Sequence, residues 1–187
     1  MIPTFEEVMT ITSRISVHEI LEPAECQAMY DTLLQLPDGA TVVEVGCDYG
    51  RSSSLILQLA RAKNMLTIHI DPWQDHPDRA SEWMQVMSER LPYHPFILLK
   101  MTTMEAAWYL MRLTPRDIDL AFIDGSHDQN VVEQDLKIVA DRVRPGGFLT
   151  AHDYPSAGVS EAIDAYVISG WEKVRQADPG FGVWRRM

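Results

Sequence analysis

Hydrophobic residues along this chain fall into short runs separated by longer stretches with helical periodicity. The apolar runs predict strands at 41–46, 66–71, 96–99, 118–124 and 147–153. The stretches between and after them predict helices near 52–63, 78–91, 103–113, 128–143 and 158–169. Nearly continuous apolar strands that alternate with amphipathic helices are typical of a parallel sheet covered by helices on both faces. The pattern therefore predicts an α/β fold of the Rossmann-like type.

The two ends of the chain differ from this repeating pattern. The first forty residues predict helices, most clearly at 23–37, where Pro23 suits a first helical turn and Met29 and Leu33 lie on an apolar stripe. The last segment, 171–187, holds two short strand-like runs on either side of 178–180, which predicts an antiparallel hairpin at a sheet edge. We expect a single domain over 1–187, with a helical segment at 1–38 and a core sheet domain at 39–187.

Composition and charge narrow the class of protein. The length of 187 residues suits one domain, and contents of 46% hydrophobic and 23% charged residues are ordinary for a globular protein. The 27 acidic residues outnumber the 16 basic ones, which gives a net charge of −11. An acidic surface repels phosphate backbones and anionic lipid, so nucleic acid and membranes are poor partners. With no signal-peptide pattern and no apolar run long enough for a bilayer, we expect a cytoplasmic protein.

Polar residues follow strand after strand in the predicted sheet. Glycines and acids follow the first strand, Asp71 ends the second, and polar stretches at 100–103, 124–127 and 152–153 follow the later ones. In open parallel sheets, ligands bind beside the carboxyl ends of the strands. The sequence therefore predicts a ligand site along this edge.

The turn after the first strand has the pattern Glu44-x-Gly46-x-x-x-Gly50-x-Ser52. It lacks the third glycine of a dinucleotide-binding motif and the lysine of a P-loop, and its acids would repel phosphate. An acid beside an open backbone favours a cationic amine, such as the methionine end of S-adenosylmethionine (SAM). Asp71, at the end of the next strand, is placed to accept hydrogen bonds from ribose hydroxyls. The alternative is a strand-to-helix turn without a ligand.

Four segments resemble the class I SAM-dependent methyltransferases, in particular the small-molecule O-methyltransferases that include the macrocin and mycinamicin sugar methyltransferases and cephalosporin-biosynthesis methyltransferase-like proteins. The segments are VEVGCDYGRSS at 43–53, HIDPW at 69–73, FIDGSHDQNVVEQDL at 122–136 and RPGGFLTAHDYPSAGV at 144–159. The resemblance implies SAM as methyl donor and a seven-stranded sheet with a reversed last strand. The residues it leads us to expect around SAM are Glu44, Gly46, Cys47, Gly50, Ser52, Ser53, Asp71, Pro72, Trp73, Met101, Thr102, Asp124 and Gly125. Trp73 has an alternative place in the core.

Candidate chemistry lies where two predicted neighbouring strands end. Asp124 and Asp153 should face one crevice, and two hard oxygen donors suit Mg²⁺. In the resembled sugar methyltransferases, acids at these positions bind metal and a histidine three residues after the first acid is the general base, which here is His127. This chain carries His152 beside Asp153 where those relatives carry two adjacent acids. Histidine favours Zn, Mn or Fe over Mg, so the expected ligands are Asp124, Asp153 and His152 for Mg²⁺ or another divalent metal.

Each of these residues also has a simpler interpretation. Asp124 would orient the pocket without metal, His127 would cap the following helix, and His152 would be structural or contact the substrate.

The leading hypothesis is a SAM-dependent methyltransferase that acts on a small molecule at a hydroxyl oxygen. The alternative is a SAM-binding subunit without transfer activity that serves in interaction or assembly. A nicotinamide-binding Rossmann protein is a weaker third reading because the third glycine is missing. Since the chain lacks a large inserted lid, we expect a partner or a second copy of the chain, in a homo-oligomer, to complete the substrate pocket.

Overall fold

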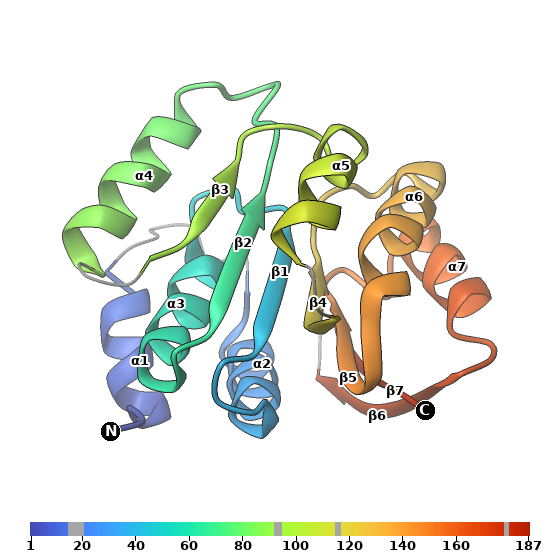
Figure 1. The fold of residues 1–187 in the computed structure, drawn as a ribbon, viewed down its shortest axis with the longest axis horizontal. Helices are drawn as coiled ribbons and strands as arrows, with labels where there is room; N and C mark the ends of the chain where they lie inside the picture. Colours follow the sequence, from blue (N-terminus) through green and yellow to red (C-terminus); the bar gives the residue numbers. More distant parts are fainter. Residues whose placement is uncertain (15–20, 92–94, 115–116, 178–179) are drawn as a thin grey trace.

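A seven-stranded sheet with helices on both faces forms the centre of the molecule (Figure 1). The computed structural model describes residues 1–14, 21–91, 95–114, 117–177 and 180–187. The helices are α1 (Phe5–Thr12), α2 (Pro23–Gln35), α3 (Arg51–Lys63), α4 (Arg79–Arg90), α5 (Thr103–Leu113), α6 (Gln129–Val139), the short 3₁₀ helix η1 (Ala140–Arg142) and α7 (Ala157–Tyr166). The strands are β1 (Thr41–Val45), β2 (Leu66–Ile70), β3 (Ile97–Leu99), β4 (Ile118–Ile123), β5 (Val143–Ala151), β6 (Trp171–Ala177) and β7 (Phe181–Arg186).

The strands lie in the order β3-β2-β1-β4-β5-β7-β6. The first five are parallel, whereas β7 pairs antiparallel with both β5 and β6. The predicted α/β class, the seven strands and the antiparallel edge hairpin are thus confirmed; the hairpin's turn, at 178–179, lies outside the described residues. Strand order reverses between β1 and β4, so the predicted ligand edge lies at this switch point.

Both faces of the sheet are buried, which is why the strands are almost uniformly apolar. On β1, Val42 packs into a core shared with α1, α2 and α3, whereas Val43 and Val45 pack into a second core shared with α5, α6 and α7. Side chains on a strand alternate between its faces, so each residue contributes to one core only. A third cluster around Trp83 joins α4 to α3.

The connection into β5 differs from the sequence-based expectation. The helix predicted to reach residue 143 ends at Val139, and β5 begins at Val143 rather than at 147. Val143 pairs with Ile118, but the register shifts before the next pair, Leu120 with Phe148. Pro145, which has no N–H to donate, lies inside this irregularity. The extra residues are absorbed as a bulge in the strand.

We predict that the C-terminal hairpin is held to the sheet by Phe181. Its fully buried ring lies 5.9 Å, between ring centroids, from the ring of Phe122 on β4. Phe181→Ala should lower the free energy of unfolding by about 3–5 kcal/mol, because it leaves a cavity in the core. Val174→Ala on β6, where the side chain is 45% exposed, is the matched control and should change it by less than about 0.5 kcal/mol. Urea denaturation of both variants measures this, and equal effects would contradict an anchoring role.

Candidate functional site

The turn between β1 and α3 makes a very close approach to the end of β4. Gly46 has φ +86°, and a Cβ placed on it would lie 2.0 Å from the backbone oxygen of Asp124. Gly50, at the N-cap of α3, also has a positive φ of +89°. Only glycine allows both this backbone conformation and this approach. The turn and Asp124 are therefore fixed side by side.

Glu44 and Ser53 lie beneath this turn rather than at a pocket surface. Both are fully buried, and Ser53 Oγ donates to Glu44 Oε2 at 2.6 Å. Glu44 Oε2 also lies 2.5 Å from His69 Nδ1 on β2. Trp83 Nε1 of α4 donates to Ser53 Oγ at 3.0 Å. The network ties β1, β2, α3 and α4 together below the turn, and neighbouring Cys47 and Ser52 are buried as well.

Asp71 holds the turn from the side. Its Oδ2 accepts hydrogen bonds from the backbone N–H groups of Cys47 at 2.8 Å and Asp48 at 3.0 Å, and its Oδ1 accepts one from Trp73 N at 2.8 Å. The Trp73 indole donates back to the Asp48 carbonyl at 3.0 Å and is 5% exposed. Trp73 thus packs in the third cluster and also contributes to the pocket wall.

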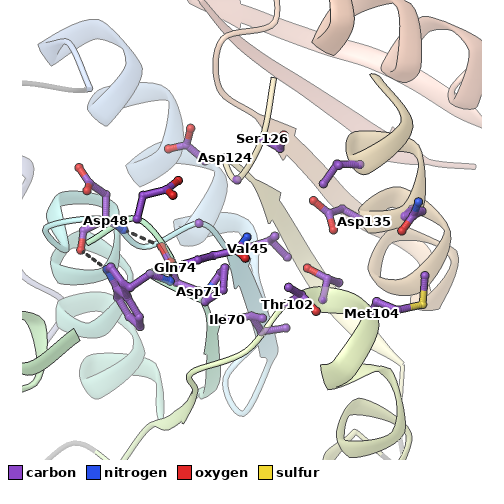
Figure 2. Close-up of a pocket in the computed structure, with 18 of the residues that line it drawn as sticks. Val45, Asp48, Ile70, Asp71, Gln74, Thr102, Met104, Asp124, Ser126 and Asp135 are labelled. Carbon is purple, nitrogen blue, oxygen red and sulfur yellow. Dashed lines mark hydrogen bonds between the residues drawn. The ribbon is translucent and has the colours of Figure 1, made fainter. Parts of the chain in front are cut away.

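A pocket of about 590 Å³ opens above these residues at the carboxyl ends of the strands. Figure 2 shows Asp48 and Asp71 on one side of it and Met104 and Asp135 on the opposite side, with Asp124 and Ser126 nearby. A volume of this size suits a nucleoside-sized ligand. The expected residues that line it are Gly46, Asp71, Pro72, Trp73, Thr102, Asp124 and Gly125. Glu44, Cys47, Gly50, Ser52, Ser53 and Met101 are not in its lining.

A second group of polar side chains gathers where β4 and β5 end. His152 Nδ1 lies 3.1 Å from Asp124 Oδ1 and also 3.1 Å from Asp153 Oδ2. His127 Nε2 lies 2.8 Å from the same oxygen, Asp153 Oδ2. These four side chains, called here the acid–histidine cluster, were each singled out from the sequence, and the structure brings them together.

Burial and mutual contact shift the pKa values within the cluster. Burial raises the pKa of Asp124 to about 6. Burial lowers the pKa of His152, but hydrogen bonds to Asp124 and Asp153 and the charges of both acids outweigh it and raise the pKa to about 11. The hydrogen bond from His152 lowers the pKa of Asp153 to about 2. His152 therefore carries a positive charge at neutral pH, which offsets the negative charge of its neighbours.

Asp128, and not His127, caps helix α6. The Asp128 carboxylate accepts hydrogen bonds from Asn130 N at 2.9 Å and Val131 N at 3.3 Å. The capping alternative for His127 is therefore wrong. Its side chain is 66% exposed and remains open to a ligand on the side away from Asp153.

Two buried acids near the site were missed by the sequence analysis. Glu25 of α2 is fully buried, and its Oε2 lies 3.3 Å from His152 Nε2. Asp135 of α6 lines the pocket at 4% exposure, and burial raises its pKa to about 6. Asp135 has a signal in the sequence, because it shares an apolar helical stripe with Val132 and Leu136. Glu25 has none, since its partner is remote along the chain.

No helix in the described part of the chain is both long and apolar enough to cross a bilayer.

Comparisons with known proteins identify a family that matches this chain. Residues 43–154 match the family model for a methyltransferase domain. A protein of Acanthamoeba polyphaga mimivirus is 27% identical over 122 residues, which cover 63% of this chain. The match spans about half of that relative, 52% of its length.

Several solved structures share the fold at low sequence identity. The O-methyltransferase NovP superposes with a TM-score of 0.73 at 13% identity, over 92% of this chain and 83% of its own. CalS11, a TDP-rhamnose 3'-O-methyltransferase of calicheamicin biosynthesis, gives 0.72 at 15% identity, over 98% and 86%. An O-methyltransferase from Bacillus cereus, solved with S-adenosylhomocysteine (SAH), gives 0.68 at 13% identity, over 100% and 93%. Since the family model matches more than half of the sequence, this chain belongs to the methyltransferase domain family.

Proposed function

We propose that this protein transfers a methyl group from SAM to a hydroxyl oxygen of a small-molecule acceptor. The observation that carries the proposal is the continuity of the site. The lining of the pocket beside Asp71 and the glycine turn includes Asp124, which belongs to the acid–histidine cluster. A donor pocket and a candidate base thus meet at one sheet edge. The O-methyltransferase names of NovP and CalS11 agree with this proposal.

SAM, when bound, supplies a methyl group on a positively charged sulfonium. On the donor side, Asp71 keeps the turn rigid with the hydrogen bonds from Cys47 N and Asp48 N and faces the pocket with its remaining acceptor capacity. A carboxylate in this position suits the hydroxyls of a ribose. Thr102, at the N-cap of α5, and Met104 form the opposite wall, which suits the adenine. Glu44 and Ser53, buried beneath the glycine turn and hydrogen-bonded to each other, support the shape of the turn.

On the acceptor side, His127 is the proposed general base. If Asp153 accepts the Nε2–H of His127, the ring is held in the tautomer whose Nδ1 carries a lone pair. That nitrogen can then accept the proton of an acceptor hydroxyl. The exposure of the ring leaves room for the acceptor.

The acid–histidine cluster also fits a divalent metal ion. Asp124, His152 and Asp153 each offer one ligand atom, and these atoms lie within 4.8 Å of one another. Ligand atoms 3.1 Å apart match neighbouring positions around an ion with bonds of about 2.1 Å. Two carboxylate oxygens and one imidazole nitrogen favour Mn²⁺, Fe²⁺ or Zn²⁺ over Mg²⁺. Such an ion would lower the pKa of an acceptor hydroxyl.

The expectation that a partner or a second copy completes the acceptor side stays a prediction.

The proposed function is tested by binding and by turnover. Isothermal titration should show SAH binding in the micromolar range and no binding of NAD. Incubation with labelled SAM and a panel of sugars and phenols should then transfer the label to a hydroxyl-bearing compound. SAH binding without transfer to any compound would favour a non-catalytic subunit, and absence of SAH binding would overturn the proposal.

We predict that Asp71→Asn weakens SAH binding by about 10- to 100-fold. Loss of the charge weakens two hydrogen bonds from the turn, one from Trp73 N and one acceptor for the ribose, and hydrogen bonds to charged groups contribute about 1.5–3 kcal/mol each. Asp78→Asn is the matched control, because Asp78 is exposed at the start of α4 and makes no side-chain capping bond. Titration calorimetry on both variants measures the effect. Equal affinities would place the ribose elsewhere.

We predict that His127→Gln lowers kcat by about 10²- to 10⁴-fold, the usual contribution of a general base. SAH affinity should stay within twofold, since His127 lies on the acceptor side of Asp124. Asp117→Asn, an exposed acid before the opposite end of β4, is the control and should retain full turnover. A His127→Gln variant with unchanged kcat on the identified acceptor would exclude His127 as the base.

A further inference from the structure

Glu25 caps helix α2, but capping does not explain why its side chain is buried. It occupies the first turn of α2, where its Oε2 accepts a hydrogen bond from Glu22 N at 2.8 Å. Glu7 makes the same bond to Thr4 N, also at 2.8 Å, at the start of α1. Glu7 is exposed, whereas Glu25 has no exposed surface. A carboxylate can therefore cap a helix in this protein without leaving water, and the burial of Glu25 requires another cause.

The other contacts of Glu25 reach across the molecule. Its Oε1 accepts a hydrogen bond from Gly180 N, beside the β6–β7 hairpin, at 2.8 Å. Its Oε2 lies 3.3 Å from His152 Nε2 at the end of β5. Burying a carboxylate is costly unless it is paired with a charge or saturated with hydrogen bonds. Within the described structure, Glu25 faces the ionisable side chain of His152, which is 7% exposed.

This contact determines which ring nitrogen of His152 faces the acid–histidine cluster. An imidazole has two nitrogens on opposite sides of its ring, so a bond at one orients the other. Nε2 faces Glu25 Oε2 at 3.3 Å, and Nδ1 is directed between Asp124 Oδ1 and Asp153 Oδ2, at 3.1 Å from each. Histidines that bind metals are generally held in this way by a carboxylate or carbonyl on their other nitrogen.

We propose that Glu25 is a positioning residue that holds His152, through its Nε2–H, as the third ligand of a divalent-metal site completed by Asp124 and Asp153. Helix α2 thereby becomes part of the acceptor half of the site, although it supplies none of the three side chains that would bind the metal. The proposal rests on the metal-assisted form of the proposed function. It adds a role for a residue that contacts neither donor nor acceptor.

Mn²⁺ binding to the full chain loaded with SAH tests this role. Glu25→Gln keeps the size of the side chain and an oxygen that can accept from Glu22 N or Gly180 N, but it removes the charge facing His152. We expect its Mn²⁺ affinity, measured by titration calorimetry and by electron paramagnetic resonance, to fall about 10- to 100-fold. Its SAH affinity should stay within twofold.

Two further variants calibrate the measurement. Glu7→Gln, the matched capping variant in α1, should bind Mn²⁺ as the native chain does, because its carboxylate contacts only the start of its own helix. Asp124→Asn, which removes a proposed ligand, should bind Mn²⁺ more weakly than Glu25→Gln. If Glu25→Gln binds Mn²⁺ as tightly as the native chain, the positioning role is overturned.

A measurement on the native chain covers the case in which Glu25→Gln does not fold. In protein loaded with Zn²⁺, nitrogen-15 spectroscopy of the histidine rings should show His152 with hydrogen on Nε2 and metal on Nδ1. Metal on Nε2 would overturn the proposal. A native chain that binds SAH and transfers methyl groups, yet binds neither Mn²⁺ nor Zn²⁺, would overturn it as well and leave methyl transfer standing. A chain that does not bind SAH would instead overturn the proposed function.

Discussion

The close contact between the glycine turn and the end of β4 is the constraint on which the site depends. Because a side chain at Gly46 would collide with the Asp124 backbone, β1 and β4 can end at the same level only with glycine there. This contact sets the pocket next to the acid–histidine cluster. The Asp71 carboxylate then fixes the turn by accepting hydrogen bonds from two of its backbone N–H groups. The donor half of the site is therefore built mainly from backbone.

The acceptor half of the site is built from ionisable side chains. Glu25, Asp124 and Asp153 surround one imidazole, and the raised pKa of His152 is the direct result of the two acids at its Nδ1. Within this arrangement the positive charge on the ring reduces repulsion between carboxylates that could not otherwise lie so close in a poorly solvated place. A divalent cation coordinated by Asp124, His152 and Asp153 would serve the same electrostatic purpose. Residue 152 is a histidine in place of a second acid. The arrangement of side chains around it is thus compatible with a bound cation and is also stable without one.

Residues adjacent to strands were predictable from the sequence, whereas contacts across the sheet were not. Asp71, Asp124 and Asp153 follow apolar runs, so parallel strands bring them to one edge whatever the details of packing. Strand alternation explains why Glu44 is not in the pocket lining: it shares a face with Val42, toward α3, and pairs in register with His69. That reasoning was available from the sequence alone. The bulge in β5 was not, because it depends on the pairing of Val143 with Ile118.

The contact between Glu25 and His152 is another contact that could not be predicted from the sequence. It also gives the C-terminal hairpin a role beyond closing the sheet edge. Glu25 accepts from Gly180 as well as facing His152, so α2, the hairpin and the end of β5 meet at one carboxylate. Each of the three is fixed by its own core contacts, such as that of Phe181 with Phe122. The geometry at Nδ1 of His152 is therefore maintained by packing far from the strand ends. A sequence motif at residues 151–154 cannot reveal this, because the motif records the histidine and not the segments that orient it.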